Sequence, residues 1–237
     1  MLESRSMRFW LPAILLAATL AAQTAPEVEV AAEPHHHLVL DNAYVRAFEV
    51  EVPPGQATLL HRHRHDYVIV TLGNAQISNE VEGKAPATTE LRDGEITFVE
   101  GPMSHVVRDL APTPFRNVTV EFLQDEKARK SPPPKWDEER GLDILEHGTQ
   151  DIMFVKDGVR VSEIDLQPGG MIPKHQHTGP HLLIAVSDLD LQSDVVGKGV
   201  SKVAVKAGEV RWVPGGFSHT LMNMSKQPAK FITLEFH

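Results

Sequence analysis

Histidine is the residue type whose number and spacing in this sequence point to chemistry, with 13 histidines in 237 residues. Six of them form two sets, each an H-x-H pair followed 42 residues later by a third histidine. The sets are His61, His63 and His105, and His175, His177 and His219. Side chains at i and i+2 of a strand face the same side, so each pair would present two imidazoles together. Three neutral imidazoles suit Fe, Mn, Co, Ni, Cu or Zn and leave positions open for water, oxygen or substrate, so the spacing predicts two metal sites.

The overall composition excludes several other chemistries. The chain has no cysteine, which rules out disulfides, thiolate zinc sites, iron–sulfur clusters and a cysteine nucleophile. Its net charge is -9 and no basic patch is evident, so we expect no nucleic-acid partner. Apolar residues at 41% and charged residues at 23% are typical of a globular protein. The expected partner is a small-molecule substrate or ligand.

An offset of 114 residues relates the two histidine sets and many other positions. Pairs at this offset include Gly55 and Gly169, Gly94 and Gly208, Arg46 and Arg160, and Glu121 and Glu235. The register holds from about residue 38 to 122 without an insertion, so we interpret the chain as two copies of one unit, 38–124 and 152–237. A unit near 87 residues is small for independent stability, so we expect the two to pack together.

Within each unit the local signals are those of β-strands. Apolar and polar residues alternate in 45–52 and 159–166, and apolar runs occur at 67–72 and 181–186. Pro-Gly and Asp-Gly pairs between these segments predict turns. No long stretch has the period and caps of a helix. Several short strands at this spacing predict an all-β sandwich or barrel.

The segments outside the two units differ in composition. Arg5 and Arg8 precede an apolar run of about 14 residues, which is too short to span a bilayer comfortably, and small residues follow. We therefore expect residues 1–22 to be a secretory signal peptide, with an uncleaved anchor helix as the alternative, and the mature protein to be periplasmic or secreted without a membrane segment. Residues 23–37, which end in three histidines, are expected to be a disordered lead-in with solvated imidazoles. Residues 125–151 are Pro-rich and charged, which is typical of a linker.

The motifs around the histidines resemble those of the cupin superfamily, and their repetition resembles a bicupin. The motif G-x5-H-x-H is matched at 55–63 and 169–177, and the motif G-x5-P-x-G-x2-H-x3-N is matched in full at 208–223. The first-unit copy of the latter, at 94–109, keeps the histidine spacing but departs at three positions. These are Glu100, Pro102 and Asp109, where the family has Pro, Gly and Asn. The resemblance implies an all-β fold of two tandem double-stranded β-helix (jelly-roll) barrels.

Neither unit has the glutamate ligand that follows H-x-H in the family motif. Its position falls at Tyr67 or Val68 in the first unit and at His181 or Leu182 in the second. The resemblance therefore implies a three-histidine site with Tyr67 near the metal, and a second site in which His181 is either a fourth ligand or contacts a ligand or the substrate. Tyr67 and His181 are also the candidate acid–base groups. The missing carboxylate favours ions that prefer imidazole, and it weighs against the manganese oxalate-degrading chemistry of germin-like and oxalate-decarboxylase-like relatives.

Other polar residues near the predicted sites have two interpretations each. Glu121 and Glu235, 16 residues after the third histidine of each set, either hydrogen-bond a ligand imidazole or lie on a solvated strand face. Arg46 and Arg160 either face outward or anchor an anionic substrate. We expect His65 at the mouth of the first barrel rather than at its metal.

Three functions are compatible with this sequence. The leading hypothesis is a non-haem dioxygenase of the Fe type that acts on a small organic substrate at the C-terminal site without an organic cofactor. The alternatives are a non-catalytic periplasmic protein that binds or senses a metal or small ligand, and a metal-assisted isomerase or lyase. The metal can be Fe, Mn, Zn, Ni or Cu, and the protein is expected to be a monomer or homodimer.

Overall fold

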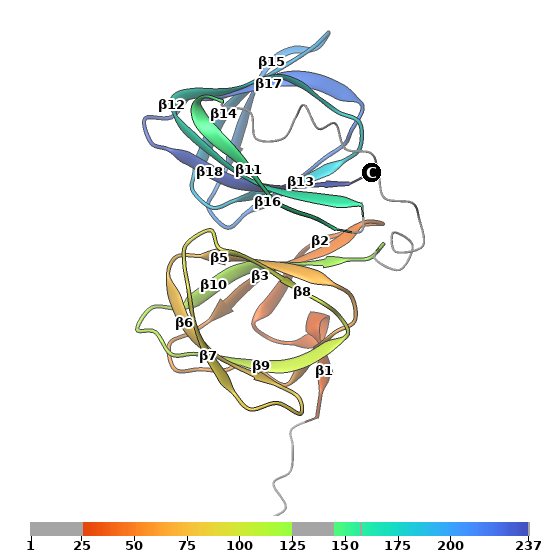
Figure 1. Cartoon of the computed structure of the whole chain (residues 1–237), viewed down its shortest axis with the longest axis vertical. Coiled ribbons are helices and arrows are strands. Elements are labelled where there is room, and N and C mark those ends of the chain that lie inside the picture. Colours follow the sequence, from red (N-terminus) through yellow and green to blue (C-terminus); the bar gives the residue numbers. More distant parts are fainter. Residues whose placement is uncertain (1–25, 125–144, 157, 237) are drawn as a thin grey trace, which may run out of the picture.

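The computed structural model describes residues 26–124, 145–156 and 158–236. Two β-barrels lie one above the other, and the described residues contain strands and a single 3-10 turn but no α-helix (Figure 1). The predicted all-β fold of two tandem jelly-roll barrels is confirmed. The described part of the chain has no helix long and apolar enough to cross a membrane. The predicted signal peptide, 1–22, and most of the predicted linker, 125–144, lie outside the described residues.

The N-terminal barrel is built from two five-stranded sheets. One sheet has the order β1 (Val28–Glu29), β4 (His61–His63), β9 (Met103–Asp109), β6 (Ala75–Val81), β7 (Ala87–Leu91). The other has the order β2 (His36–Asp41), β3 (Val45–Val52), β10 (Phe115–Phe122), β5 (Tyr67–Leu72), β8 (Ile96–Val99). The 3-10 turn η1 (Val30–Ala32) joins β1 to the second sheet.

The C-terminal barrel repeats this plan with its strands joined into one sheet. The order is β15 (Gly199–Val205), β14 (Leu189–Val195), β17 (Phe217–Asn223), β12 (Val159–His177), β18 (Ala229–Phe236), β13 (His181–Ala185), β16 (Val210–Val213), with β11 (Glu146–Lys156) also paired to β12. The long strand β12 corresponds to β3 and β4 together, because its first part pairs with β18 and its last part with β17.

Strand register confirms that the offset of 114 residues is a structural repeat. Arg46 pairs with Glu121 between β3 and β10, and Arg160 pairs with Glu235 between β12 and β18. In the opposite wall of each barrel, His61 pairs with His105 and the equivalent residue His175 pairs with His219. Cross-strand neighbours lie about 5 Å apart, so this register alone brings two of the three histidines of each set together.

A hydrophobic core lies between the two barrels, as expected for units too small to be stable alone, and each barrel also has a core of its own. The sheet that contains β3, β10 and β5 faces β13, β16 and β18 of the other barrel (Figure 1). The fully buried residues of the core between the barrels include Val45, Val68, Val118 and Val120 from the first unit and Val161, Leu182, Ile184, Ile232 and Leu234 from the second. Burying each such side chain contributes about 1.5–3 kcal/mol, so each barrel stabilises the other.

Strand parity then decides which polar side chains face the barrel interiors. Along β10, Val118 and Val120 pack in the core between the barrels. Thr119 and Glu121 therefore face the interior of the N-terminal barrel, since successive side chains alternate between the two faces of a strand. Both are buried. The solvated-face interpretation of Glu121 is therefore excluded.

Two of the predicted segment boundaries are wrong. Residues 28–37 do not form a disordered lead-in: β1 pairs in parallel with β4, η1 buries Val30, and His36 begins β2. This segment becomes ordered because the barrel supplies the partners that its own sequence lacks. The last residues of the predicted linker, 146–151, belong to β11 of the C-terminal barrel.

Candidate metal centres

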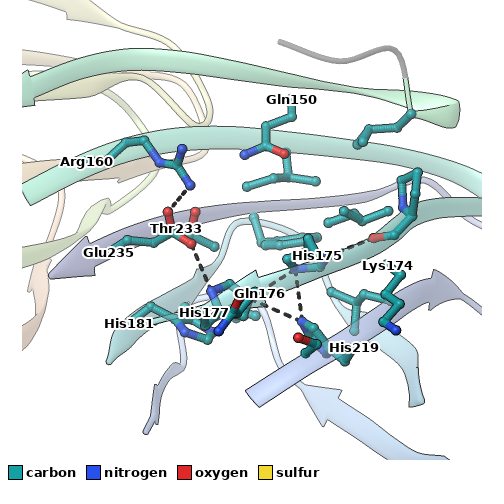
Figure 2. Close-up of a pocket in the computed structure, with 18 residues that line it drawn as sticks. Gln150, Arg160, Lys174, His175, Gln176, His177, His181, His219, Thr233 and Glu235 are labelled. Carbon is teal, nitrogen blue, oxygen red and sulfur yellow. Dashed lines mark hydrogen bonds and ion pairs between the residues drawn. The ribbon is translucent and has the colours of Figure 1, made fainter. Parts of the chain in front are cut away.

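The three histidines predicted in the C-terminal barrel converge on one point (Figure 2). The Nε2 atoms of His175 and His177 are 3.0 Å apart, those of His177 and His219 are 3.2 Å apart, and those of His219 and His175 are 3.0 Å apart. Two nitrogens that each lie about 2.0–2.1 Å from one zinc ion are themselves roughly 3 Å apart. The spacing of the three nitrogens therefore fits a shared first-row metal ion.

Each of these imidazoles is held by a hydrogen bond at its other nitrogen. His175 Nδ1 lies 2.8 Å from Pro173 O, and His177 Nδ1 lies 2.9 Å from Glu235 Oε1. His219 Nδ1 lies 2.8 Å from Ser193 Oγ. An Nδ1–H that donates to such a partner fixes the tautomer and leaves the Nε2 lone pair for a metal. Burial, followed by the neighbouring histidines, lowers the pKa of His219 to about 3, so its ring is neutral at pH 7.

Glu235 links the triad to Arg160. Its carboxylate accepts a hydrogen bond from His177 and forms an ion pair with the Arg160 guanidinium (Figure 2). Burial would raise the pKa of Glu235, but the hydrogen bond from His177 and the charge of Arg160 outweigh it and lower the pKa to about 2. Glu235 is thus an ionised partner of a candidate ligand, and Arg160, which is 5% exposed, faces inward rather than outward.

A cavity of about 450 Å³ opens beside the triad. Its polar lining includes Gln150, Arg160, Lys174, Gln176, His181 and Glu235 (Figure 2). His175 is half-buried, and Lys174 and Gln176 on either side of it are exposed. The candidate metal position is therefore reachable from solvent.

His181 lies beside the triad but outside the group of converging nitrogens. Its ring stacks on that of His177 with 4.0 Å between centroids and 25° between planes. Its Nδ1 is buried and has no hydrogen-bond partner among the described residues. Burial, followed by the charge of His177, lowers the pKa of His181 to about 3. This geometry fits a group that contacts a ligand or substrate better than it fits a fourth metal ligand.

The N-terminal barrel has the equivalent three histidines in the same arrangement. The ring centroid of His61 lies 5.1 Å from that of His63 and 4.5 Å from that of His105. The centroids of His63 and His105 are 5.4 Å apart. His61 Nδ1 lies 2.9 Å from Leu59 O, and His63 Nδ1 lies 3.2 Å from Glu121 Oε1. His105 Nδ1 lies 2.9 Å from Asn79 Oδ1. The Nε2 atoms of His61 and His105 are buried without a partner in the described part of the chain. A metal ion would satisfy both lone pairs.

A fourth histidine, His36, joins this group, and the prediction that it is solvated is wrong. It is 9% exposed, and its ring centroid lies 4.7 Å from that of His61 and 5.9 Å from that of His63. One nitrogen from each of these three residues lies within 4.8 Å of the others. The offset of 114 residues relates His36 to Gln150, which lines the cavity of the other barrel.

Tyr67 occupies the position in the first barrel that His181 has in the second. Its ring stacks on His63 with 4.1 Å between centroids and 19° between planes, and its hydroxyl donates to Met103 Sδ at 3.5 Å. Burial, followed by the charge of Glu121, raises the pKa of Tyr67, so its hydroxyl stays protonated. These residues line a cavity of about 350 Å³. Tyr67 therefore lies beside the histidine group of the N-terminal barrel.

The remaining predicted site residues are also placed by the structure. Arg46 lies 3.7 Å from Glu121 and 3.3 Å from Asp41, and about a third of its side chain is exposed. It is paired with protein carboxylates rather than directed at the metal position. His65 is part of neither group of candidate ligands.

Comparison with known proteins supports the fold. No protein-family model and no curated protein matches the sequence. Among solved structures, the oxalate decarboxylase of Lactobacillus farciminis in complex with formate is similar at 14% identity, with a TM-score of 0.59 over 84% of this chain and 83% of that chain. The oxalate decarboxylase of Bacillus subtilis, described for its Mn(II) centres, is similar at 14% identity, with a TM-score of 0.57 over 85% of this chain and 76% of that chain.

The chain therefore shares its two-barrel fold with these oxalate decarboxylases, and both barrels contain histidine groups that can hold a metal ion. The donor set in each is imidazole nitrogen without a carboxylate. Such a set suits divalent transition ions rather than Mg²⁺ or Ca²⁺.

Proposed function

We propose that this chain is a metal-dependent oxidoreductase of the dioxygenase type, acting on a small organic substrate in the C-terminal barrel. The proposal depends on one observation, the convergence of three Nε2 atoms at 3.0–3.2 Å on the wall of an open cavity of about 450 Å³. Three protein ligands leave positions on a first-row ion for substrate and oxygen. The cavity volume is in the range of small-molecule sites.

The residues of the chain have separate tasks in this proposal. His175, His177 and His219 hold the ion, and Glu235 keeps His177 in the tautomer that can bind it. When bound, a ferrous ion supplies the one-electron and oxygen chemistry that no side chain of the site provides. Lys174 and Gln176 at the opening offer polar contacts to an entering substrate.

His181 orients the substrate in this proposal. Its buried Nδ1 can accept a hydrogen bond, whereas a pKa of about 3 makes its imidazole a weak base at pH 7. Efficient general bases have a pKa near the working pH. The same argument weighs against an isomerase or lyase that would rely on His181 as its base.

Oxygen uptake tests the proposal. Protein purified without a His tag or nickel column is stripped of metal, reloaded with Fe²⁺, and supplied with phenolic, diketone and thiol substrates. We expect substrate-dependent oxygen consumption by the iron-loaded protein, its loss in His175→Ala/His219→Ala, and its retention in the matched variant His61→Ala/His105→Ala. Equal oxygen consumption by apo and iron-loaded protein would refute the proposal.

Two other readouts separate the alternatives. Product formation without oxygen would indicate the isomerase or lyase. A ligand-induced thermal shift without turnover would indicate a non-catalytic binding or sensing protein.

We also propose that the protein is exported, on the basis of the basic and apolar N-terminal sequence. Cleavage after Ala21 or Ala22 would leave intact every contact of the described N-terminal segment, which starts at residue 26. Mass spectrometry of the mature N-terminus from a periplasmic fraction tests this, and an intact Met1 in that fraction would contradict it.

A further inference from the structure

We infer that the N-terminal barrel contains a second ligand site, a pocket for a small, neutral and mostly apolar molecule that carries one oxygen able to accept a hydrogen bond. The pocket is the cavity of about 350 Å³ that extends from the histidine group into the barrel. It lies in the other barrel from the proposed active site and needs no metal ion, so this inference and the proposed function can fail separately.

The N-terminal barrel has smaller or more polar residues at positions that large apolar residues fill in the C-terminal barrel. The pairs at the offset of 114 residues are Asn117 and Phe231, Val107 and Leu221, and Thr89 and Val203. The first member of each pair lines the N-terminal cavity, and the second packs in the hydrophobic core of the C-terminal barrel. Because asparagine is much smaller than phenylalanine, the N-terminal barrel lacks side-chain volume that its copy has.

The walls of this space are mostly apolar. Ile96 and Phe98 of β8 pack in the core between the barrels, so Thr97 and Val99 face the barrel interior by strand alternation. The apolar side chains that other strands contribute to the lining are those of Val50, Val52, Ile69, Ile77, Leu91 and Phe115. An apolar cavity of about 150 Å³ can already hold a molecule of the size of benzene. The larger N-terminal cavity therefore has room for a substituted ring.

Charge distinguishes this cavity from the C-terminal one. Arg160, Lys174 and Glu235 line the C-terminal cavity. The described residues that line the N-terminal cavity include no Lys or Arg, and their carboxylate is that of Glu95. Glu95 Oε2 accepts the backbone N–H of Arg92 at 3.0 Å in an exposed turn. Moving a charged group from water into an apolar cavity without a partner is costly, so the lining favours a neutral ligand.

Asn117 supplies a polar contact for that ligand. Its side chain lines the cavity, and the residue is 4% exposed. Thr119 Oγ1 donates a hydrogen bond to Asn117 Oδ1 at 2.8 Å, which leaves Asn117 Nδ2 as the group that can donate to a ligand. A carbonyl or hydroxyl oxygen would accept this bond. The equivalent residue Phe231 has no donor, so the C-terminal barrel lacks this contact.

The cavity reaches the surface at two edge strands. β7 and β8 are the last strands of their respective sheets, and both contribute to the lining. Thr89 on β7 is exposed and Thr97 on β8 is half-buried, so a ligand can enter beside them. The equivalent strands β15 and β16 contribute no described residue to the C-terminal cavity, which opens at Lys174 and Gln176 instead. The two cavities therefore have separate entrances.

Methyl NMR of the full chain tests the inference with two probes. Acetophenone is a neutral ring with one carbonyl oxygen, and benzoate is the same ring with a carboxylate. We expect acetophenone to cause saturable shifts in the methyl signals of Ile77, Leu91 and Val107, both in the protein as purified and after metal removal. Benzoate should bind at least tenfold more weakly, because its charge would have no Lys or Arg to pair with in the cavity.

Asn117→Phe, which introduces the residue of the C-terminal repeat, should weaken acetophenone binding at least tenfold. Thr88→Phe is the matched control, since Thr88 is exposed, lies next to Thr89 on β7 and does not line the cavity. It should bind acetophenone like the wild type. If Asn117→Phe does not fold, Val107→Leu/Thr89→Val makes two smaller changes toward the C-terminal repeat and should weaken binding at least threefold.

Three results would overturn the inference. These are the absence of saturable acetophenone shifts in the N-terminal methyl signals, binding of acetophenone only when metal is present, and wild-type affinity in the folded cavity-filling variant. Equal affinity for benzoate would overturn the assignment to neutral ligands. None of these measurements depends on oxygen uptake or on the C-terminal histidines, so the outcome is distinct from that of the proposed function.

Discussion

Glu235→Gln separates the two tasks of the carboxylate behind the C-terminal triad. In the folded protein Glu235 has a pKa of about 2 instead of 4.5. One pKa unit corresponds to about 1.4 kcal/mol, so the ionised form gains about 3 kcal/mol from its surroundings. Breaking a buried ion pair by removing one partner costs about 3–5 kcal/mol, which agrees with this value. We therefore expect the free energy of unfolding of the apo protein to fall by about 3 kcal/mol in urea denaturation.

The same substitution should also weaken metal binding. The neutral amide of Glu235→Gln would no longer present a charged acceptor to His177 Nδ1, and loss of such a partner typically reduces metal affinity about 10–100-fold. Chelator competition with the stripped protein measures this change. The matched substitution Glu121→Gln should cost less stability, because Arg46 is 33% exposed and water can solvate it, whereas the Arg160 side chain is 6% exposed.

The double variant Arg160→Gln/Glu235→Gln distinguishes the two effects. Removing the buried charge of Arg160 should restore part of the lost stability, but metal affinity should stay low because His177 still lacks its carboxylate. Our reasoning would be refuted if Glu235→Gln bound metal within twofold of the wild type. It would also be refuted if the double variant recovered full metal affinity, since the effect would then come from Arg160 alone.

Two further predictions concern the histidine sites and the fold. Burial lowers the folded-state pKa of His61 to about 3 from 6.5, so the unfolded state binds more protons below pH 6.5. The apo protein should therefore lose about 2 kcal/mol per such histidine between pH 7 and pH 5, which urea melts at the two pH values will measure. Gly101→Ala should destabilise the protein, because a Cβ there would lie 2.2 Å from the carbonyl oxygen of His65, and a thermal melt equal to that of the wild type would show that the loop adapts.

The repeat and the H-x-H pairs carried most of what could be predicted from the sequence. The structure brings the six equivalent histidines together three to a barrel, and this grouping could be expected because strand parity and a constant offset can both be read directly from a sequence. The roles of Glu121 and Glu235 stayed open at that stage, since parity indicates a shared face but not which face is buried. The face is set by Val118 and its neighbours packing against the other barrel, which is a tertiary contact.

His36 was missed for a related reason. It lies in a segment of Ala, Glu and Pro with three consecutive histidines, and nothing local distinguishes its imidazole from those of His35 and His37. Its burial depends on Glu33, which bonds to Leu59, and on β1 adding to β4. The orientation of His181 was equally out of reach, because stacking on His177 rather than pointing at the metal position is a matter of side-chain packing.

A duplicated barrel gives two copies of one site, and single positions around each triad then determine how far the copies differ. Tyr67 and His181 stack on equivalent histidines but offer different hydrogen-bonding groups. Tyr67 has a hydroxyl that donates, whereas His181 has a buried Nδ1 without a partner among the described residues. His36 and Gln150, at equivalent positions, differ by one imidazole. The apolar face shared by the barrels couples their stabilities, so an ion bound in the N-terminal barrel would also stabilise the C-terminal one.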